Sequence, residues 1–413
     1  MTHPTTAPGT VPAPAPEARI HESFRRLTAP GGRQAIQLTR GPGFCYPLYY
    51  YVPAITRDGR WLIHHRAVDA TVQLHRLDLW TGESVQLSHA TSPETWWRPW
   101  CWDAGSGVRD HLSALDVARD RVVWFDGNLA QCHDLRTGTT TDLFRLPDDR
   151  MPIGQDCVTP DGRWFVFIHA DRDAYLSTFE GDPDYDTWWS RRERCRDTHL
   201  EAFDLATGER RTLVVIASPI HHVLAYDERH LLFCHPVAEE GILLTDIEGG
   251  WYTHLRTQRD DGGQVCHYLG TRRGVAYEIH RGTGPQRAGM LDPFGRAGFE
   301  LDLPPDMGYI HTGRDPEGLL WFYESDAAGR HDIRFLEAHD PGGQDLWRNL
   351  TTDWQPFGDP DGQKAHHHPQ VVLDRRWLLI TAGDPDDRTN QVFLLDIADL
   401  EPTRGIPDVL GVP

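Results

Sequence analysis

Apolar residues occur along the chain in short runs that alternate with turn-forming residues. Runs such as "RWLIHH", "RVVWFD" and "RWFVFIH" are rich in β-branched and aromatic residues and are bounded by Gly, Asp or Pro. Such runs are typical of strands joined in antiparallel hairpins. Helical periodicity is absent, apart from a stretch around Trp188–Arg196 that allows one short helix. The pattern therefore predicts an all-β protein.

A longer pattern repeats along the chain: a D-G-type turn, an apolar strand, a gap, and a strand that ends in L-D and a T-G-E-like turn. A self-similar unit of about 40–65 residues with three or four strands indicates a β-propeller, here with seven blades. The seventh copy ends at "FLLDIADL" without a fourth strand. We expect the N-terminal segment "RQAIQLT" (33–39) to complete that blade and close the ring, which removes open sheet edges. The seven copies begin at Asp58, Arg119, Asp161, Asp227, Thr271, Pro316 and Asp374.

The N-terminal residues differ in composition from the rest of the 413-residue chain. Residues 1–20 are rich in Pro, Ala and Thr, which predicts a disordered extension, and residues 21–413 form a single propeller domain in this interpretation. The N-terminus has no apolar signal region, and no apolar run approaches the ~20 residues of a membrane-spanning helix. Seven scattered cysteines without C-x-x-C favour free thiols in a reducing compartment. We therefore expect a cytoplasmic protein.

The formal charge of −20 restricts the possible partners. Binding to nucleic acid or to an anionic membrane requires a basic face, so neither is expected. An acidic substrate would need locally concentrated positive charge. The long gap in the third copy (171–199) contains Trp188, Trp189, Arg191, Arg192 and Arg194. This segment is either an anion-binding lip or a solvated helix that covers a blade edge.

Histidines recur just before the first strand of successive copies. The stretch "QKAHHHPQ" (363–370) places Gln363, His366 and His368 at Q-x-x-H-x-H spacing, and side chains two residues apart in extended chain point the same way. Imidazole and amide ligands suit Mn, Fe, Ni or Zn. The pattern predicts a metal site at the central channel, and a structural polar funnel is the alternative. The preceding copies carry histidine at the same place: His311, His267, and His221 with His222.

Several segments resemble the oligogalacturonate lyases, a family of cytoplasmic seven-bladed propellers. The resemblance lies in "GFCYPLYYYVPAITRDGRWLI", "WWSRRERCRDTHLEAFDLATGE", "LLFCHPVAEEGILLTDIEGG", "QVCHYLGTRRGVAYEIHRG", "MGYIHTGRDPEGLLW" and "QKAHHHPQVVLDRRWLLIT". It implies a manganese-type ion held by three histidines and a glutamine, and a histidine base. These roles fall on His311, Gln363, His366 and His368 for the metal, and on His267 for the base.

The same resemblance places a catalytic arginine at the start of "GILLTDIEGG", where this chain has Gly241. It also makes His235, in "LLFCHP", a candidate for substrate contact. Arg191, Arg192 and Arg194 are candidates for binding further uronate carboxylates. The identity of any residue that replaces the missing arginine stays open.

The residues fit β-elimination from an acidic oligosaccharide. Removal of the C5 proton of a uronate is easier when a divalent cation neutralises the neighbouring carboxylate, and a neutral histidine is a suitable base. Hydrolysis would instead require a carboxylate pair, and none stands out among 61 acidic residues. Two alternatives stay open: a lyase for another uronate, such as a glucuronate-containing oligosaccharide, and a non-catalytic propeller related to TolB. Linkage, metal identity and oligomeric state are not specified.

Overall fold

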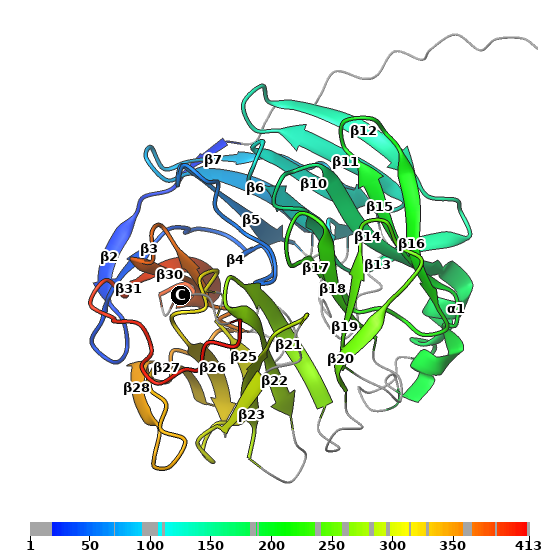
Figure 1. Cartoon of the computed structure of the whole chain (residues 1–413). Helices are drawn as coiled ribbons and strands as arrows, with labels where there is room; N and C mark the ends of the chain where they lie inside the picture. Colours follow the sequence, from blue (N-terminus) through cyan, green and yellow to red (C-terminus); the bar gives the residue numbers. More distant parts are fainter. Residues whose placement is uncertain are drawn as a thin grey trace, which may run out of the picture.

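The computed structural model describes most of the chain outside its N-terminal segment and several loops. It is all-β and propeller-like: the chain runs once around a ring, from the blue strands through green and yellow to the red ones (Figure 1). The predicted all-β class is therefore confirmed. The described residues are 19–69, 71–92, 106–109, 112–181, 187, 190–235, 241–257, 264–280, 285–294, 298–313, 315–327, 330–357, 366–384 and 386–410.

In the described part of the chain, five sheets of four to six strands follow the sequence repeat. Each begins with the strand that precedes the turn opening its copy, and this strand is called the first strand of the copy from here on. The first sheet contains β4 (Phe44–Pro47), β5 (Trp61–Val68), β6 (Thr71–Asp78) and β7 (Glu83–Gln86), with β1 (Arg19–His21) and β8 (Ser106–Gly107) added at its sides. The second sheet contains β9 (Ser113–Asp116), β10 (Arg121–Asp126), β11 (Leu129–Asp134) and β12 (Thr139–Arg145). Neighbouring strands are antiparallel, except that β8 pairs parallel with β6.

The sheets of the fifth and sixth copies have four strands each. They contain β21 (Gln264–Thr271), β22 (Gly274–His280), β23 (Arg287–Leu291) and β24 (Gly298–Asp302), then β25 (Tyr309–Thr312), β26 (Phe322–Ala327), β27 (Arg330–Ala338) and β28 (Leu346–Thr351).

The third and fourth copies share one eight-stranded sheet. Its two antiparallel halves are joined by a parallel pairing between β13 and β17, with Gln155 opposite His222. Gln155 N–H donates to the carbonyl of His221 at 2.8 Å. The halves contain β13 (Arg150–Val158), β14 (Trp164–Asp171), β15 (Thr198–Asp204) and β16 (Arg210–Ile216), then β17 (His222–Ala225), β18 (His230–His235), β19 (Gly241–Asp246) and β20 (Thr253–Thr257).

The last sheet joins the two ends of the chain. β3 (Gln34–Gln37) pairs antiparallel with β31 (Thr389–Asp396), as the sequence pattern predicts, with Ala35 opposite Leu395. Thr39 Oγ1 donates to Gln391 at 2.7 Å, and Gln37 Nε2 donates to Asp384 at 2.7 Å; both bonds are buried. The sheet is completed by β2 (Arg25–Thr28), β29 (Gln370–Val372) and β30 (Trp377–Asp384).

The repeated L-D and D-G-R motifs have a structural explanation. The aspartate at the end of the third strand accepts hydrogen bonds from the next turn: Asp78 Oδ1 accepts from the backbone of Trp80 and Thr81. Its other oxygen accepts from the arginine of the D-G-R turn, Arg60, at 2.9 Å. Arg163 with Asp204 and Arg229 with Asp246 repeat the arrangement. Each such unit thereby links the start of its second strand to the end of its third.

Helix is almost absent from the described residues. The segment inserted in the third copy contributes α1 (Arg172–Ser177) and a 3₁₀ turn at Arg192–Arg194. α1 lies at the rim of the ring in Figure 1, and Asp171 caps its N-terminus by accepting from Ala174 N–H. Within the described part of the chain, no helix has the length and apolar composition needed to cross a membrane.

The buried bonds at the junction of the chain ends predict a stability effect. Replacing Gln37 by Leu removes a buried donor to Asp384, so Gln37→Leu should lower the free energy of unfolding by about 1–3 kcal/mol. Gln34→Leu, at an exposed position of the same strand, is the matched control. Urea unfolding curves should separate the two variants, and equal midpoints would contradict a stabilising role for this junction.

Candidate active site

Four predicted histidines come together from three successive copies. His311 lies on β25, His366 and His368 lie in the segment before β29, and His267 lies on β21. All four are buried. The ring centroid of His311 is 4.7 Å from that of His366, 4.8 Å from that of His368 and 4.3 Å from that of His267. We call these four residues the histidine cluster.

A buried carboxylate supports three members of the histidine cluster. Glu324 on β26 is the cross-strand partner of His311, and its Oε2 lies 3.5 Å from His311 Nδ1. Its Oε1 lies 3.2 Å from His366 Nδ1. The backbone N–H groups of His367 and His368 donate to the two carboxylate oxygens at 2.8 and 3.0 Å. One side chain thus holds β25 and the 366–368 segment together.

This arrangement selects which ring nitrogens face the centre of the cluster. Burial alone would raise the pKa of Glu324, but hydrogen bonds from His311 and His366 outweigh it and hold that pKa well below its usual value. The ionised carboxylate uses Nδ1 of both rings, so Nε2 is the nitrogen that can bind a metal ion. His367 turns away, and its Nδ1–H donates to the carbonyl of Thr381 at 2.6 Å.

The donor set fits a divalent transition metal. His311 and His366 are gathered around Glu324, with one candidate donor atom of each of the three residues within 4.8 Å of the others, and the ring of His368 lies beside that of His366. Imidazole ligands backed by a carboxylate are common in such sites. Gln363, the fourth predicted ligand, lies outside the described residues.

Two members of the histidine cluster have unusual backbone conformations. His267 has φ of 47° and His368 has φ of 45°, in the left-handed region that costs a non-glycine residue of order 1–3 kcal/mol. The register of β21 against β22 shifts between Cys266 and Leu269, so His267 sits in a bulge of its strand. Bulges re-aim side chains next to functional sites.

Two successive tyrosines, Tyr49 and Tyr50, pack against the histidine cluster. The ring of Tyr50 stacks on His368 at a centroid distance of 5.1 Å, with 17° between the ring planes. Tyr49 meets the edge of His368 at 5.1 Å and stacks on His222 at 5.6 Å. Gln370 Nε2 donates to the carbonyl of Leu48 at 3.0 Å, which ties this tyrosine segment to β29. The cluster therefore has an aromatic wall.

His267 has its own carboxylate neighbour. Its Nδ1 lies 2.8 Å from Oε2 of Glu278 on β22 and 3.3 Å from Nε2 of His280. Burial, with smaller contributions from His311 and His280, lowers the pKa of His267 well below its usual value. The ring is therefore neutral at physiological pH. His267, Glu278 and His280 form a second group with metal-ligand spacing.

The predicted arginine candidates lie on the inserted segment. Arg191 Nη1 donates to the carbonyl of Glu180 at 2.5 Å and Arg194 Nη1 to that of Ser177 at 3.0 Å, so both attach the segment to the end of α1. Arg192 is buried. His235 ends β18. A substrate contact by any of these four residues stays a prediction.

The structure explains why no arginine stands at Gly241. A side chain at this position would place its Cβ 2.0 Å from the carbonyl oxygen of Arg256 on the neighbouring strand β20. The backbones of β19 and β20 are therefore too close for any larger residue. Charge for an acidic substrate must come from elsewhere in the chain.

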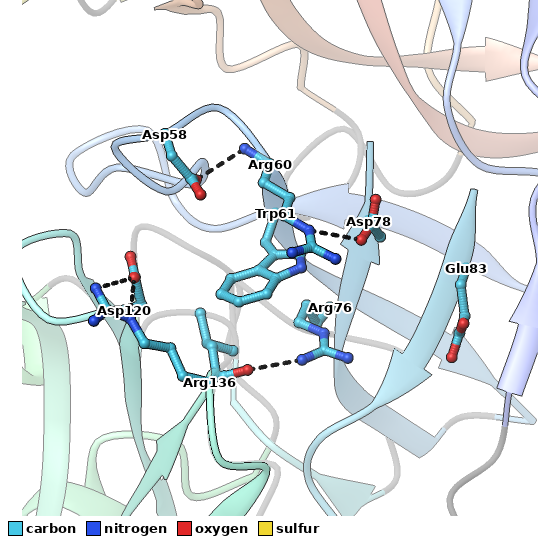
Figure 2. A pocket seen from close by; sticks show the side chains of 9 residues that line it. Asp58, Arg60, Trp61, Arg76, Asp78, Glu83, Asp120 and Arg136 are labelled. Carbon is cyan, nitrogen blue, oxygen red and sulfur yellow. Dashed lines mark hydrogen bonds and ion pairs between the residues drawn. The ribbon is translucent and has the colours of Figure 1, made fainter. Parts of the chain in front are cut away.

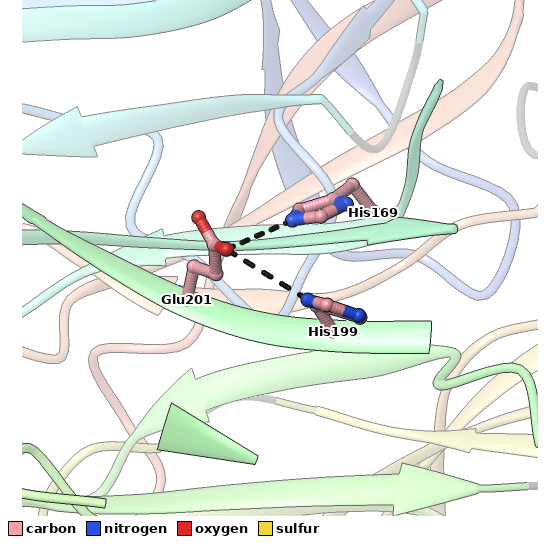
Figure 3. A group of neighbouring side chains, drawn as sticks. All are labelled: His169, His199 and Glu201. Atoms are coloured by element: carbon pink, nitrogen blue, oxygen red, sulfur yellow. Dashed lines mark ion pairs between the residues drawn. The ribbon is translucent and has the colours of Figure 1, made fainter. Parts of the chain in front are cut away.

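A further group with metal-ligand spacing lies on β14 and β15 (Figure 3). His169 is the cross-strand partner of His199, and His169 Nε2 lies 3.1 Å from Glu201 Oε1. Arg150 Nε donates to His169 Nδ1 at 2.9 Å, so the proton of this imidazole sits on Nε2. Burial raises the pKa of Glu201, but His169 and Arg210 lower it to about 2. Two arginines and the fixed tautomer oppose a cation here.

A surface pocket of about 600 Å³ lies between the first two sheets (Figure 2). Its tryptophan, Trp61, has the guanidinium carbons of Arg60 and Arg76 at 5.0 and 5.1 Å from a ring centroid. Trp164 has Arg163 and Arg211 at 4.9 and 4.8 Å in the same way. The stacking of two arginines on the tryptophan after a D-G-R turn therefore recurs in the first and third copies.

Comparison with known proteins tests the predicted resemblance to the oligogalacturonate lyases. No family model matches the chain. The oligogalacturonate lyase of Dickeya dadantii (strain 3937) is 22% identical over 375 residues, covering 85% of this chain and 90% of that protein. The predicted resemblance to the oligogalacturonate lyases is confirmed.

Solved structures of oligogalacturonate lyases share the fold. The enzyme from Vibrio parahaemolyticus aligns with a TM-score of 0.74 at 16% identity, over 93% of this chain and 99% of that chain. An oligogalacturonate lyase in complex with manganese aligns with the same TM-score at 19% identity, over 92% and 98% of the two chains. The WD40 repeats of RRP9 align less well, with a TM-score of 0.53 at 8% identity over 90% of this chain.

Two carboxylates of the candidate active site were not predicted. Glu324 and Glu278 follow a tyrosine in the second strand of consecutive copies, in "WFYESD" and "VAYEIH". A glutamate recurring at one position of an otherwise apolar strand is the signal that could have identified them. The tyrosine segment gives no such signal, because its contacts to the histidines span the length of the chain.

The support by Glu324 predicts a metal-binding effect. Glu324→Gln keeps the size of the side chain and removes its charge, so the affinity for Mn²⁺ should fall about 10–100-fold. Calorimetric titration of the metal-free protein with Mn²⁺ measures this. Glu201→Gln, in the group on β14 and β15, is the control and should leave the affinity unchanged. A loss of Mn²⁺ affinity in Glu201→Gln but not in Glu324→Gln would place the metal in the group on β14 and β15.

Proposed function

We propose that the protein is a metal-dependent lyase that cleaves oligogalacturonate-type oligosaccharides by β-elimination. The observation that supports this best is the convergence of His267 with His311, His366 and His368 in one buried cluster. The similarity to the oligogalacturonate lyase of Dickeya dadantii supports the same function. We also infer that the two halves of the eight-stranded sheet act as separate blades, which gives a closed propeller of seven.

The proposed ligands are His311, Gln363, His366 and His368, and manganese is the proposed metal because a related lyase was solved with it. A bound divalent ion would neutralise the carboxylate of the uronate and so acidify its C5 proton. Glu324 keeps the imidazoles of His311 and His366 turned with Nε2 toward this position. The tyrosine segment shields one side of the cluster from water.

His267 is the proposed base. Its neutral ring accepts the C5 proton, the C5–H electron pair forms the C4=C5 double bond, and the glycosidic oxygen leaves C4 with its bonding pair. The leaving oxygen then takes up a proton. One product carries a new reducing end, and the other carries the unsaturated uronate. Arg191, Arg192, Arg194 and His235 remain proposals for contacts to the rest of the oligosaccharide.

A different uronate is a second candidate substrate, and Gly241 favours it. The resemblance places a catalytic arginine at this position, which the close approach of β19 and β20 excludes. A change at this point can accompany a change of sugar. Galacturonate and glucuronate oligomers should therefore be assayed in parallel for the ultraviolet absorbance of the unsaturated product.

The base is tested by one substitution. His267→Ala should lower turnover by about 10²–10⁴-fold, because the proton acceptor is lost, while the Mn²⁺ content stays at the wild-type value. His199→Ala, outside the histidine cluster, is the control with unchanged turnover. Unchanged turnover in His267→Ala would remove this residue from the mechanism.

The metal requirement is tested separately by chelation. Removal of the divalent ion should abolish elimination, and added Mn²⁺ should restore it, because the substrate carboxylate is no longer neutralised in the metal-free protein. Full turnover after chelation, with metal absent by elemental analysis, would contradict the proposed mechanism. A wild-type protein that binds Mn²⁺ but yields no unsaturated product from any uronate oligomer would argue against a lyase.

A further inference from the structure

The carboxylate of Glu278 lies behind the proposed base and is used by no other part of the mechanism. Glu278 is completely buried on β22, and its cross-strand partner is Cys266, the residue before His267. Its Oε2 lies 2.8 Å from His267 Nδ1 and 3.4 Å from His280 Nε2. A buried carboxylate at hydrogen-bond distance from an imidazole fixes both the orientation and the tautomer of that ring.

The neighbouring copy shows the same arrangement. Glu324 occupies the second strand of the sixth copy as Glu278 occupies that of the fifth, and each contacts Nδ1 of the histidine on its own first strand. In the sixth copy this contact leaves Nε2 of His311 for the centre of the cluster. The repeat of the fold therefore places His267 Nε2 in the equivalent role.

We propose that Glu278 is a positioning residue that accepts the Nδ1–H of His267 and thereby keeps Nε2 as the proton acceptor of the elimination. This inference rests on the proposed function. The bulge at His267 makes such support necessary, because its backbone conformation (φ of 47°) is otherwise unfavourable.

The accepting role belongs to the ionised form of Glu278, because a carboxylate can only accept and Nδ1 must then carry the proton. Burial and the nearby Glu324 raise the pKa of Glu278 well above its usual value. A neutral Glu278 with its proton on Oε2, which lies 2.8 Å from His267 Nδ1, would donate to that nitrogen and select the opposite tautomer. The tautomer of His267 therefore distinguishes the two forms.

A catalytic test compares Glu278→Ala with Glu278→Gln. In Glu278→Ala the acceptor is lost, so kcat should fall at least about 10²-fold while KM changes little and Mn²⁺ stoichiometry stays the same. Glu278→Gln keeps an acceptor oxygen and should recover part of the lost kcat. Glu300→Gln, on β24 of the same sheet, is the control for a general loss of stability, followed by thermal unfolding.

A spectroscopic test separates this inference from the proposed function. The ¹⁵N spectrum of histidine-labelled protein, with His267 assigned by the His267→Ala variant, reports which ring nitrogen carries the proton. The Nδ1–H tautomer in the wild type and its loss in Glu278→Ala would support the inference even if no oligomer were cleaved. An Nε2–H tautomer in the wild type would overturn it. So would a second Mn²⁺ per chain that disappears in Glu278→Ala, because Glu278 would then be a metal ligand.

Discussion

The buried carboxylate of Glu324 is the interaction on which the candidate active site depends. An ionised carboxylate inside a protein costs several kcal/mol unless it is fully hydrogen-bonded. Glu324 meets this requirement with two backbone N–H groups of the 366–368 segment and two imidazoles from different copies of the repeat. Its partners therefore cannot move independently, and the nitrogens that face the centre of the cluster are selected together.

The repeat architecture explains how such a site can be assembled from distant parts of the chain. The first strands of the second to sixth copies follow one another around the ring, since β9 contacts β13, β13 contacts β17, β17 contacts β21 and β21 contacts β25 (Figure 1). His267 and His311 lie on the first strands of the fifth and sixth copies, and the 366–368 segment precedes that of the seventh. The glutamates behind them repeat in the same way.

Much of this could be predicted from the sequence, because it depends on local patterns. The D-G-R and L-D motifs encode hydrogen bonds within one hairpin unit, such as those of Arg60 and Asp78, and they define the copies. Histidine spacing predicted the convergence at His311, His366 and His368. The contacts of Tyr50 with His368 join residues more than 300 positions apart, and no local pattern reports them. The shared eight-stranded sheet likewise depends on one pairing between copies, at Gln155.

Glycine in place of arginine at position 241 bears on the choice of substrate, and the support of His267 by Glu278 bears on the rate. The histidine cluster decides whether a metal binds at all. A crystal structure of the protein with Mn²⁺, with anomalous diffraction collected at the manganese absorption edge, is the most direct measurement. The account predicts one anomalous peak within bonding distance of Nε2 of His311, His366 and His368. A peak at His169, His199 and Glu201, or no peak in the histidine cluster at saturating Mn²⁺, would contradict it.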